Sequence, residues 1–256
     1  MKKVLMIIGI VFLLPIIGFS FYIIDWFYYS AIDDKAEKAA IHYFEEKYNE
    51  KFVISEVSYS RALGDDYGMY DLVAHPQNSP GIEVDLQVSE EFEIIREDYK
   101  ESKWGYEVRE EYIQMVEPLF PKAGNIWAHG SFPEEISDRY GIQDTYQTIV
   151  SENQFQSFES VKLLIFEEPA GDEKQLASIY QLWQLIQERN IRDYRIDISY
   201  YPEKLLNSFH TIKDSNQFEN ENRKQAIYFC SITSSQTKAN PISTAEDIEK
   251  YCRVLK

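Results

Sequence analysis

The longest hydrophobic run lies near the N-terminus. Val4–Ile24 holds 21 residues without a charged side chain, directly after Lys2 and Lys3. As a helix it would rise roughly 31 Å, about the thickness of the hydrocarbon core of a bilayer. Four aromatic residues follow at positions 26–29, where an interfacial belt would lie. The pattern predicts a membrane anchor over residues 1–31 that spans the bilayer with residues 4–24.

The same segment allows two alternatives to a permanent anchor. Gly18-Phe19-Ser20 offers a small-x-small site, so a signal peptide could be cleaved after Ser20. Such cleavage would leave an adhesive aromatic terminus, beginning at Phe21, on a soluble protein. A buried core helix is the second alternative, and a lipoprotein is disfavoured because neither cysteine lies near the segment. We favour a single-pass anchor in the cell membrane, with the bulk of the chain extracytoplasmic.

Beyond the anchor, the pattern predicts a first unit over residues 32–122. A helix begins at Asp33 or Asp34 and continues to about Asn49, with alanine and aromatic side chains along one stripe. Three strands follow, over Phe52–Ser60, Tyr70–His75 and Ile82–Val88. The last strand alternates most clearly between apolar and polar residues. That alternation is typical of an antiparallel sheet with one face buried and the other in water.

The period becomes helical after Tyr99. Trp104, Val108 and Tyr112 share one face, and the run ends at Pro118. The first unit is therefore predicted as α-β-β-β-α. Residues 123–157 are rich in Gly, Ser, Gln and Asn and show weak periodicity, which predicts a linker with a short helix over Pro133–Tyr140.

A second unit is predicted over residues 158–256. Its strands are expected at Val161–Phe166, Tyr194–Tyr201 and Ala226–Thr233. A helix starts near Ala170, and residues 213–224 form a polar loop. Ser243-Thr244-Ala245-Glu246 has the sequence of a capping box for a terminal helix. The order β-α-β-β-α predicts helices on one face of an antiparallel sheet, so the fold class is α+β.

Composition limits the classes of function. The chain is 44% hydrophobic and 15% aromatic, which is enough apolar material to fill a core. Its formal charge is −17, and residues 32–256 carry −18 because Lys2, Lys3 and Asp25 together contribute +1. Such a charge repels DNA, RNA and anionic lipid headgroups. We therefore expect no nucleic acid among the partners, whereas basic peptides are attracted in a salt-dependent way.

Cys230 and Cys252 are the two cysteines of the chain. Neither belongs to a CxxC motif or a Cys/His cluster, and their number fits an oxidising or a reducing compartment. A bond between them would close a loop of 22 residues and stabilise the fold by roughly 3 kcal/mol. Two separate buried thiols are the alternative.

Several features together resemble a known family. They are the Lys2-Lys3 anchor, the helix Ala39-Ala40-Ile41-His42-Tyr43-Phe44-Glu45-Glu46-Lys47-Tyr48, the alternating strand that follows, and the stretch Asp98-Tyr99…Lys103-Trp104. In these features the first half of the chain is similar to YfjL-like proteins, which are uncharacterised single-span exported proteins of Gram-positive bacteria. The resemblance implies a localisation and supplies no catalytic residue.

No residues combine into a catalytic, metal or nucleotide motif. His129 lies near Ser131, but G-x-S-x-G is absent and no acidic residue is placed to orient the imidazole. Glu83 and Asp85 share a strand face, with His75 on a neighbouring strand, and such a set can perform acid/base chemistry or bind a cation. The alternation explains both acids more simply as the solvated face of a sheet. We assign no catalytic, cofactor-binding or metal-binding residue and expect no cofactor.

An anchor, a foldable acidic body and the absence of a site motif indicate a non-enzymatic module at the cell surface that binds a protein or peptide. The exposed edge strands of a small antiparallel sheet can accept a peptide by strand addition. One alternative is an envelope hydrolase with a His/carboxylate site. Another is a structural accessory of a membrane complex.

Protease treatment of intact spheroplasts tests the predicted topology. A C-terminal tag should be lost while the fragment with Met1 and Lys2 is retained, because the bulk of the chain lies outside the cytoplasm. Mass analysis of the N-terminus checks the anchor in the same sample. A protected tag would contradict the orientation, and a new N-terminus at Phe21 would contradict the permanent anchor.

Overall fold

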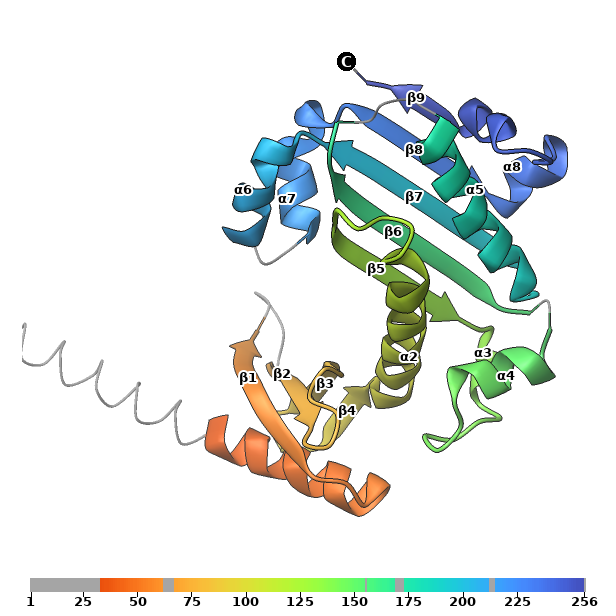
Figure 1. The fold of residues 1–256 in the computed structure, drawn as a ribbon. Coiled ribbons are helices and arrows are strands. Elements are labelled where there is room, and N and C mark those ends of the chain that lie inside the picture. Colours follow the sequence, from red (N-terminus) through yellow and green to blue (C-terminus); the bar gives the residue numbers. More distant parts are fainter. Residues whose placement is uncertain (1–32, 62–66, 155, 169–172, 212–214, 256) are drawn as a thin grey trace, which may run out of the picture. The chain divides into compact units, whose positions relative to one another are not determined.

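The structure is a computed structural model that describes residues 33–61, 67–154, 156–168, 173–211 and 215–255 (Figure 1). The chain divides into two compact units, Met1–Tyr99 and Lys100–Lys256. The predicted anchor over residues 1–31 lies outside the described residues. No helix within the described ranges is both long and apolar enough to cross a membrane.

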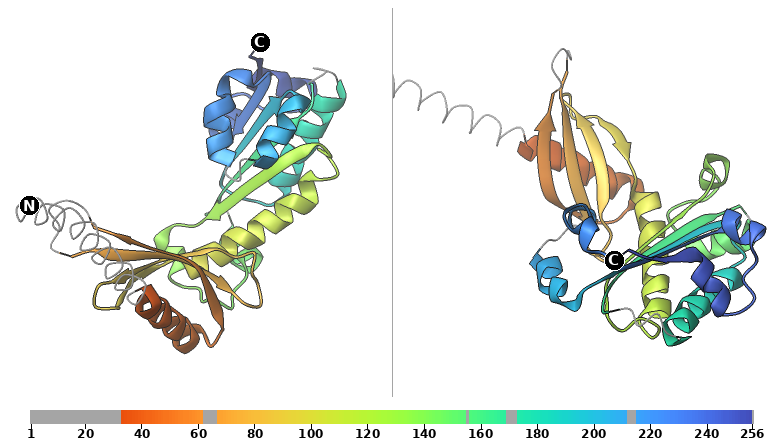
Figure 2. Two further views of the ribbon diagram at one scale, coloured as in Figure 1. Left: turned by 90° about the vertical axis from the view of Figure 1, so that its left-hand side faces the viewer. Right: turned by 90° about the horizontal axis from the view of Figure 1, so that it is seen from above.

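The first unit consists of one helix and a four-stranded sheet. The helix covers residues 33–48, and all neighbouring strands are antiparallel, in the order β1-β2-β3-β4. The strands are β1 (Phe52–Ser60), β2 (Met69–Pro76), β3 (Val84–Ser89) and β4 (Ile94–Glu97). The helix lies along one face of the sheet (Figure 2), and its Phe44 ring stacks on Phe52 with 4.1 Å between ring centroids.

The predicted helix and the three predicted strands of this unit are present, and β4 is an addition. β4 is four residues long and has no buried position, so it lacks the alternation by which strands are identified. The chain reaches it through a tight turn in which Phe92 adopts a positive φ of 65°. Such a turn is normally indicated by Gly, Asn or Asp, which are absent at this position.

The helix predicted after Tyr99 is present as α2 (Tyr99–Val116) but contributes to the second unit. Trp104, Val108 and Tyr112 are buried in the core of that unit. An amphipathic period shows that a helix has a buried face but not which sheet covers it. The unit boundary expected at residue 122 is therefore corrected to lie between Tyr99 and Lys100.

The second unit is built on a five-stranded sheet with the order β5-β6-β7-β8-β9. The strands are β5 (Ala123–Ser131), β6 (Phe158–Phe166), β7 (Asp193–Tyr201), β8 (Tyr228–Thr233) and β9 (Cys252–Val254). Helix α5 (Glu173–Glu188) connects β6 to β7, and these two strands are parallel. The other pairs are antiparallel. The α+β class is confirmed, and the expectation of a purely antiparallel second sheet is corrected at this one pair.

Residues 123–157 are not a linker. They contain β5 and the helices α3 (Glu134–Ser137) and α4 (Tyr146–Glu152). The glycines that weakened the strand pattern have a packing role, since a Cβ at Gly124 would lie 2.5 Å from the Phe166 ring. A Cβ at Gly130 would similarly lie 2.4 Å from the Tyr146 hydroxyl oxygen. Glycine in a strand often marks such a close approach, and it dilutes the alternation that identifies a strand.

The C-terminal third differs from the prediction in two places. The segment expected as a polar loop contains helix α7 (Ser215–Asn222). The expected terminal helix is a 3₁₀ turn, Glu246–Tyr251, followed by β9. A capping box forms instead at Thr233 and Gln236, where α8 (Ser234–Ala239) begins. The remaining helices are α6 (Leu206–Thr211) and the 3₁₀ turns Glu203–Leu205 and Arg223–Gln225.

Cys230 and Cys252 form a disulfide between β8 and β9. The two residues are directly opposite each other in the antiparallel ladder, with 4.0 Å between their Cα atoms. The bond therefore attaches the three-residue strand β9 to the sheet. Of the two alternatives left open by the sequence, the structure has the bonded pair.

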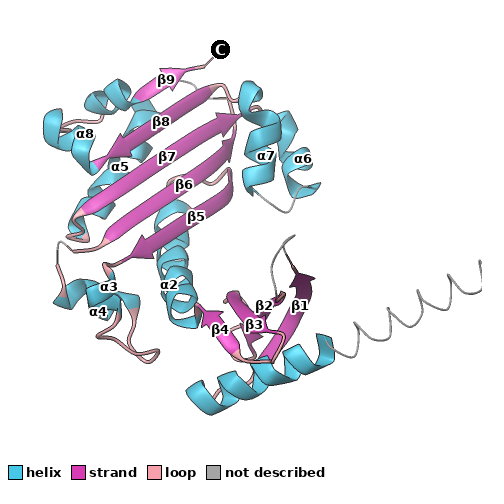
Figure 3. Cartoon of the chain, turned by 180° about the vertical axis from the view of Figure 1, so that it is seen from behind, coloured by secondary structure: helices cyan, strands magenta, loops and turns pink. Residues whose placement is uncertain are grey.

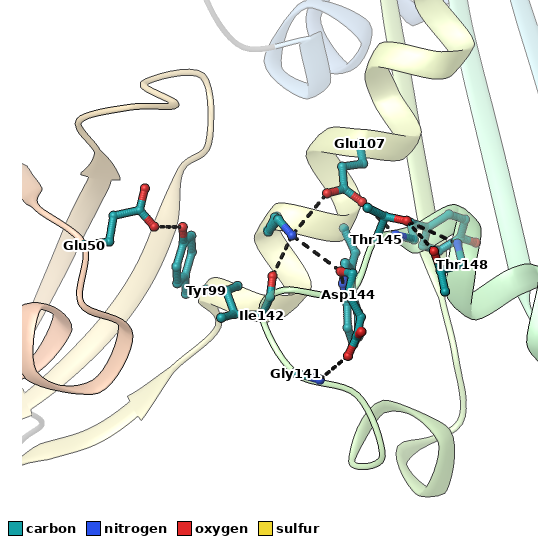
Figure 4. A network of polar contacts seen from close by, with 11 residues as sticks. Glu50, Tyr99, Glu107, Gly141, Ile142, Asp144, Thr145 and Thr148 are labelled. Carbon is teal, nitrogen blue, oxygen red and sulfur yellow. Dashed lines mark hydrogen bonds and ion pairs between the residues drawn. The ribbon is translucent and has the colours of Figure 1, made fainter.

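The start of α2 holds the loop before α4 (Figure 4). Lys103 donates to the carbonyl oxygen of Ile142 at 2.6 Å, and the Trp104 indole donates to that of Asp144 at 2.9 Å. The Glu107 carboxylate accepts from the backbone N–H of Tyr146 at 2.7 Å. These bonds satisfy backbone groups of a loop that has no sheet partner.

A buried ion pair lies at the end of the core where β6 begins. Glu159 is fully buried, and its carboxylate accepts two hydrogen bonds from Arg189, at 2.8 and 3.0 Å. The Tyr112 hydroxyl on α2 donates to the same carboxylate at 2.6 Å. Arg189 also forms an ion pair with Glu111 at 2.6 Å. Burial and the Glu159 charge hold the pKa of Tyr112 well above its ordinary value, so its hydroxyl remains a donor.

Replacing Arg189 with Met should lower the free energy of unfolding of the second unit by about 3–5 kcal/mol, because the Glu159 charge would stay buried without its partner. Hydrogen exchange of the β6 and β7 amides in urea measures this loss for the second unit alone. Arg192→Met is the matched control, since the Arg192 side chain is 67% exposed and should cost less than about 1 kcal/mol. Equal losses in both variants would contradict a special role for the buried pair.

Candidate functional site

The five-stranded sheet has one helix-covered face and one open face. Helices α2 and α5 pack on the side that carries the buried aliphatic side chains of β6, β7 and β8. Figure 3 shows the opposite side toward the viewer, with these two helices behind the sheet. Strand register places two rows of residues on the open face: Trp127, Lys162, Asp197 and Ser231 in one, and His129, Ser160, Arg195 and Thr233 in the other.

One end of this face is covered by short helices. Leu164, Phe166 and Tyr201 pack against Leu205 and Phe218 from the segment that contains α6 and α7. This second, smaller core explains why β6 is apolar on both faces toward its end. The open area is therefore the part of the face around the two polar rows.

Trp127 and His129 occupy alternate positions on β5 at the margin of the open face. Their rings stack, with 5.8 Å between centroids and 18° between planes. Trp127 is 45% exposed, so a large aromatic surface remains accessible to solvent. His129 keeps contact with solvent, but the surrounding side chains remove part of its hydration and lower its pKa from the ordinary value of 6.5.

Asp197 organises the centre of the open face. Its carboxylate accepts from the Ser231 hydroxyl at 2.6 Å and from the Arg195 guanidinium, also at 2.6 Å. Lys162 on the neighbouring strand forms an ion pair with Glu219 of α7. Charges of both signs on this face are thus already paired, so the arrangement suits hydrogen bonding to a polar ligand better than attraction of a strongly charged one.

The first sheet also has an open face, opposite its helix. A hollow of about 350 Å³ lies there, lined by Glu56, Asp71, Asp85, Arg96 and Asp98 together with neighbouring strand residues. Gln87 donates to Asp71 at 2.9 Å, and the backbone N–H of Asp85 donates to Asp98 at 2.8 Å. Within the described ranges, no group of three or more His, Cys, Asp or Glu residues is placed to hold a metal ion.

The histidines singled out from the sequence have other contacts than those expected. His75 lies on β2, where its Nε2 is 3.0 Å from the Ser55 hydroxyl and its Nδ1 is 2.9 Å from the carbonyl oxygen of Ile82. Of the two acids considered with it, Asp85 lines the hollow and Glu83 directly precedes β3. His129 stacks on Trp127, with Ser131 two residues further along β5.

The sequence did not identify Ser55 or Trp127. Ser55 lies at an irregularity in the pairing of β1, between Ile54 and Glu56, for which the sequence has no signal. Trp127 lies in the segment that composition assigned to a linker. The short apolar run Ile126-Trp127-Ala128, with a β-branched and an aromatic residue, was the available signal for a strand.

Comparison with known proteins yields a likeness in fold. No family model matches the chain, and no curated protein does. A crystal structure of a DUF5037 family protein from Ruminococcus gnavus ATCC 29149 is similar, with a TM-score of 0.52 and 16% sequence identity. The match covers 86% of this chain and 98% of that one. At this identity the likeness concerns the fold alone, and the resemblance to YfjL-like proteins stays a prediction.

The stacked pair makes a testable prediction about titration. NMR of the imidazole should give His129 a pKa below 6.5, and Trp127→Ala should raise it by restoring water around the ring. Because folding lowers this pKa, the contribution of His129 to stability is fully present above pH 6.5. It is lost as the pH falls through the folded-state pKa. A pKa unchanged by Trp127→Ala would contradict the assigned cause.

Proposed function

We propose that the chain is a membrane-tethered, extracytoplasmic module that binds an extended peptide or a protein segment along β5, the edge strand of its second sheet. The observation that carries the proposal is an edge strand whose pairing is regular from Asn125 to Ser131 and which exposes Trp127 and His129 on an open sheet face. An added strand would pair with the backbone of β5 and place alternate side chains on that face.

The four edge strands of the two sheets differ in their fitness for strand addition. β4 has four residues and β9 has three, so each offers few backbone groups. β1 has nine residues but is irregular at Ser55. β5 also has nine residues, and its pairing with β6 is regular from Asn125 to Ser131. A bulge or a short length protects an edge from pairing, and this part of β5 has neither.

Side chains on the open face would supply selectivity. Trp127 offers an aromatic surface for an apolar or cationic side chain of the ligand. Beyond it lie Asp197 and Ser231, which are hydrogen-bonding groups already held in place by each other. The formal charge of −17 favours ligands with basic residues through long-range attraction.

The disulfide supports the proposed side of the membrane. A bond such as Cys230–Cys252 forms and persists in oxidising surroundings, which for a cell-surface protein lie outside the cytoplasm. The uncharged run at residues 4–24 supplies the tether. Together they favour a body that faces the exterior and meets its partner there.

Peptide-library selection on the full-length chain in nanodiscs tests the proposed surface. Trp127→Ala should weaken the binding of selected peptides about 30-fold, the equivalent of about 2 kcal/mol, because interface tryptophans commonly contribute that much. Hydrogen exchange should show new protection of β5 amides when a selected peptide is present. Isothermal titration calorimetry gives the affinities.

Tyr67→Ala is the matched control, since Tyr67 is an aromatic residue that is 73% exposed and lies outside both sheets. This variant should bind the selected peptides as the natural chain does. Peptides that lose affinity equally in both variants, or that leave β5 exchange unchanged, would contradict strand addition at β5. A selection that enriches no peptide would count against the proposal as well.

A further inference from the structure

We propose that Ser55 and His75 form a nucleophile–base pair that hydrolyses esters of apolar carboxylic acids at the open face of the first sheet. The pair lies in a different unit from β5, so the inference is independent of the peptide-binding proposal. It rests on the position of Ser55 in the strand, on the hydrogen bonds of His75, and on a hollow that His75 helps to line.

Irregular pairing in β1 brings the serine to the histidine. Val53 is opposite His75 and Glu56 is opposite Val73, so one extra residue of β1 stands between these two pairs. The extra residue leaves Ser55 and Glu56 both exposed, although neighbours in a regular strand point to opposite faces. The Ser55 hydroxyl consequently lies 3.0 Å from Nε2 of His75. Bulges of this kind re-aim side chains and are common beside active sites.

The second nitrogen of His75 fixes the direction of that hydrogen bond. Nδ1 lies 2.9 Å from the backbone carbonyl oxygen of Ile82, which can only accept a hydrogen bond. In the neutral ring the proton is therefore on Nδ1, and Nε2 carries the free electron pair. Nε2 is then an acceptor for the Ser55 hydroxyl at 3.0 Å, and it competes with the Val73 carbonyl oxygen, which lies farther away at 3.3 Å. The Ser55 hydroxyl, the His75 imidazole and the Ile82 carbonyl oxygen thus follow one another in this order. A serine hydrolase has the same arrangement, with a carboxylate in the position of the carbonyl.

A hollow that His75 helps to line favours one class of substrate. It measures about 400 Å³ and is lined by Val53, Pro76, Pro80, Gln77 and His75 itself. Two prolines and a valine form an apolar wall that suits an acyl chain without charge. Val53 is half exposed, so its side chain is accessible to a ligand in this hollow. Gln77 also lines this hollow and carries a side-chain amide.

The reaction follows from this arrangement. Oγ of Ser55 forms a bond to the ester carbonyl carbon while its proton moves to Nε2 of His75. The carbon–oxygen bond to the leaving alcohol then breaks, and the alcohol takes the proton from Nε2. Water attacks the acyl-serine in the same way, and the carboxylic acid leaves as Ser55 regains its proton. No oxidant, metal or further reactant is needed for this balance.

Covalent labelling of the full-length chain in nanodiscs is the decisive experiment. A fluorophosphonate probe should form an adduct on Ser55, identified by mass spectrometry of the digested protein. The same preparation should hydrolyse p-nitrophenyl butyrate. Ser55→Ala should abolish both signals, and His75→Gln should slow hydrolysis at least about 100-fold, the usual contribution of a general base.

Ser58→Ala is the matched control because Ser58 is an exposed serine of the same strand whose hydroxyl bonds to the backbone carbonyl of Asp71. It should keep full labelling and hydrolysis. Absence of an adduct on Ser55 of the unsubstituted chain would overturn the proposal whether or not the variants fold. Hydrolysis that survives Ser55→Ala would also overturn it. If Ser58→Ala lost hydrolysis as fully as Ser55→Ala, the loss would come from damage to the strand, and this result would overturn the proposal as well.

Discussion

The bidentate ion pair between Glu159 and Arg189 is the interaction on which the architecture of the second unit depends. Glu159 belongs to the helix-covered face of β6, where the alternate positions Val161, Leu163 and Ile165 are all buried. A slip of one residue in strand register would exchange the two faces of a strand. It would also remove Glu159 from Arg189 and from the Tyr112 hydroxyl. A buried ion pair adds little to stability compared with apolar packing, but breaking it is costly, so it penalises the wrong register.

The same constraint defines the open face. Because Glu159 points into the core, Phe158, Ser160 and Lys162 point to the opposite face. Trp127 and His129 on β5 are paired with Lys162 and Ser160, so they lie on that face too. The parallel β6–β7 pair places Arg195 and Asp197 there as well. The residues of the proposed peptide-binding surface therefore lie on the open face because the residues next to them in each strand point into the core. The kinds of residue distinguish this surface from an ordinary charged sheet face. It has a stacked Trp–His pair on β5 and, two strands away on β7, an acid that is held by hydrogen bonds.

Periodic segments were predictable from the sequence, and features set by distant packing were not. β1 has the bounds expected from alternation, and α2 and α5 follow their apolar stripes. β5 was missed because Gly124 and Gly130 admit the rings of Phe166 and Tyr146, and those contacts join segments far apart in the chain. The site residues show the same division. His75 was considered together with Glu83 and Asp85 but was not assigned a role. Ser55 became its neighbour only through a bulge, and the sequence of β1 is that of an ordinary strand at that point.

The two edge strands with proposed activities, β1 and β5, differ in the regularity of their pairing. An irregularity at Ser55 interrupts the regular spacing of backbone donors and acceptors along β1, which discourages a peptide from pairing there. It also places the Ser55 hydroxyl near His75, so the irregular edge strand is the one for which we propose chemistry. β5 is regular from Asn125 to Ser131, and its neighbouring side chains form no hydroxyl–imidazole pair among the contacts described, so its features favour binding. Strand regularity therefore explains why binding is assigned to one sheet and bond cleavage to the other.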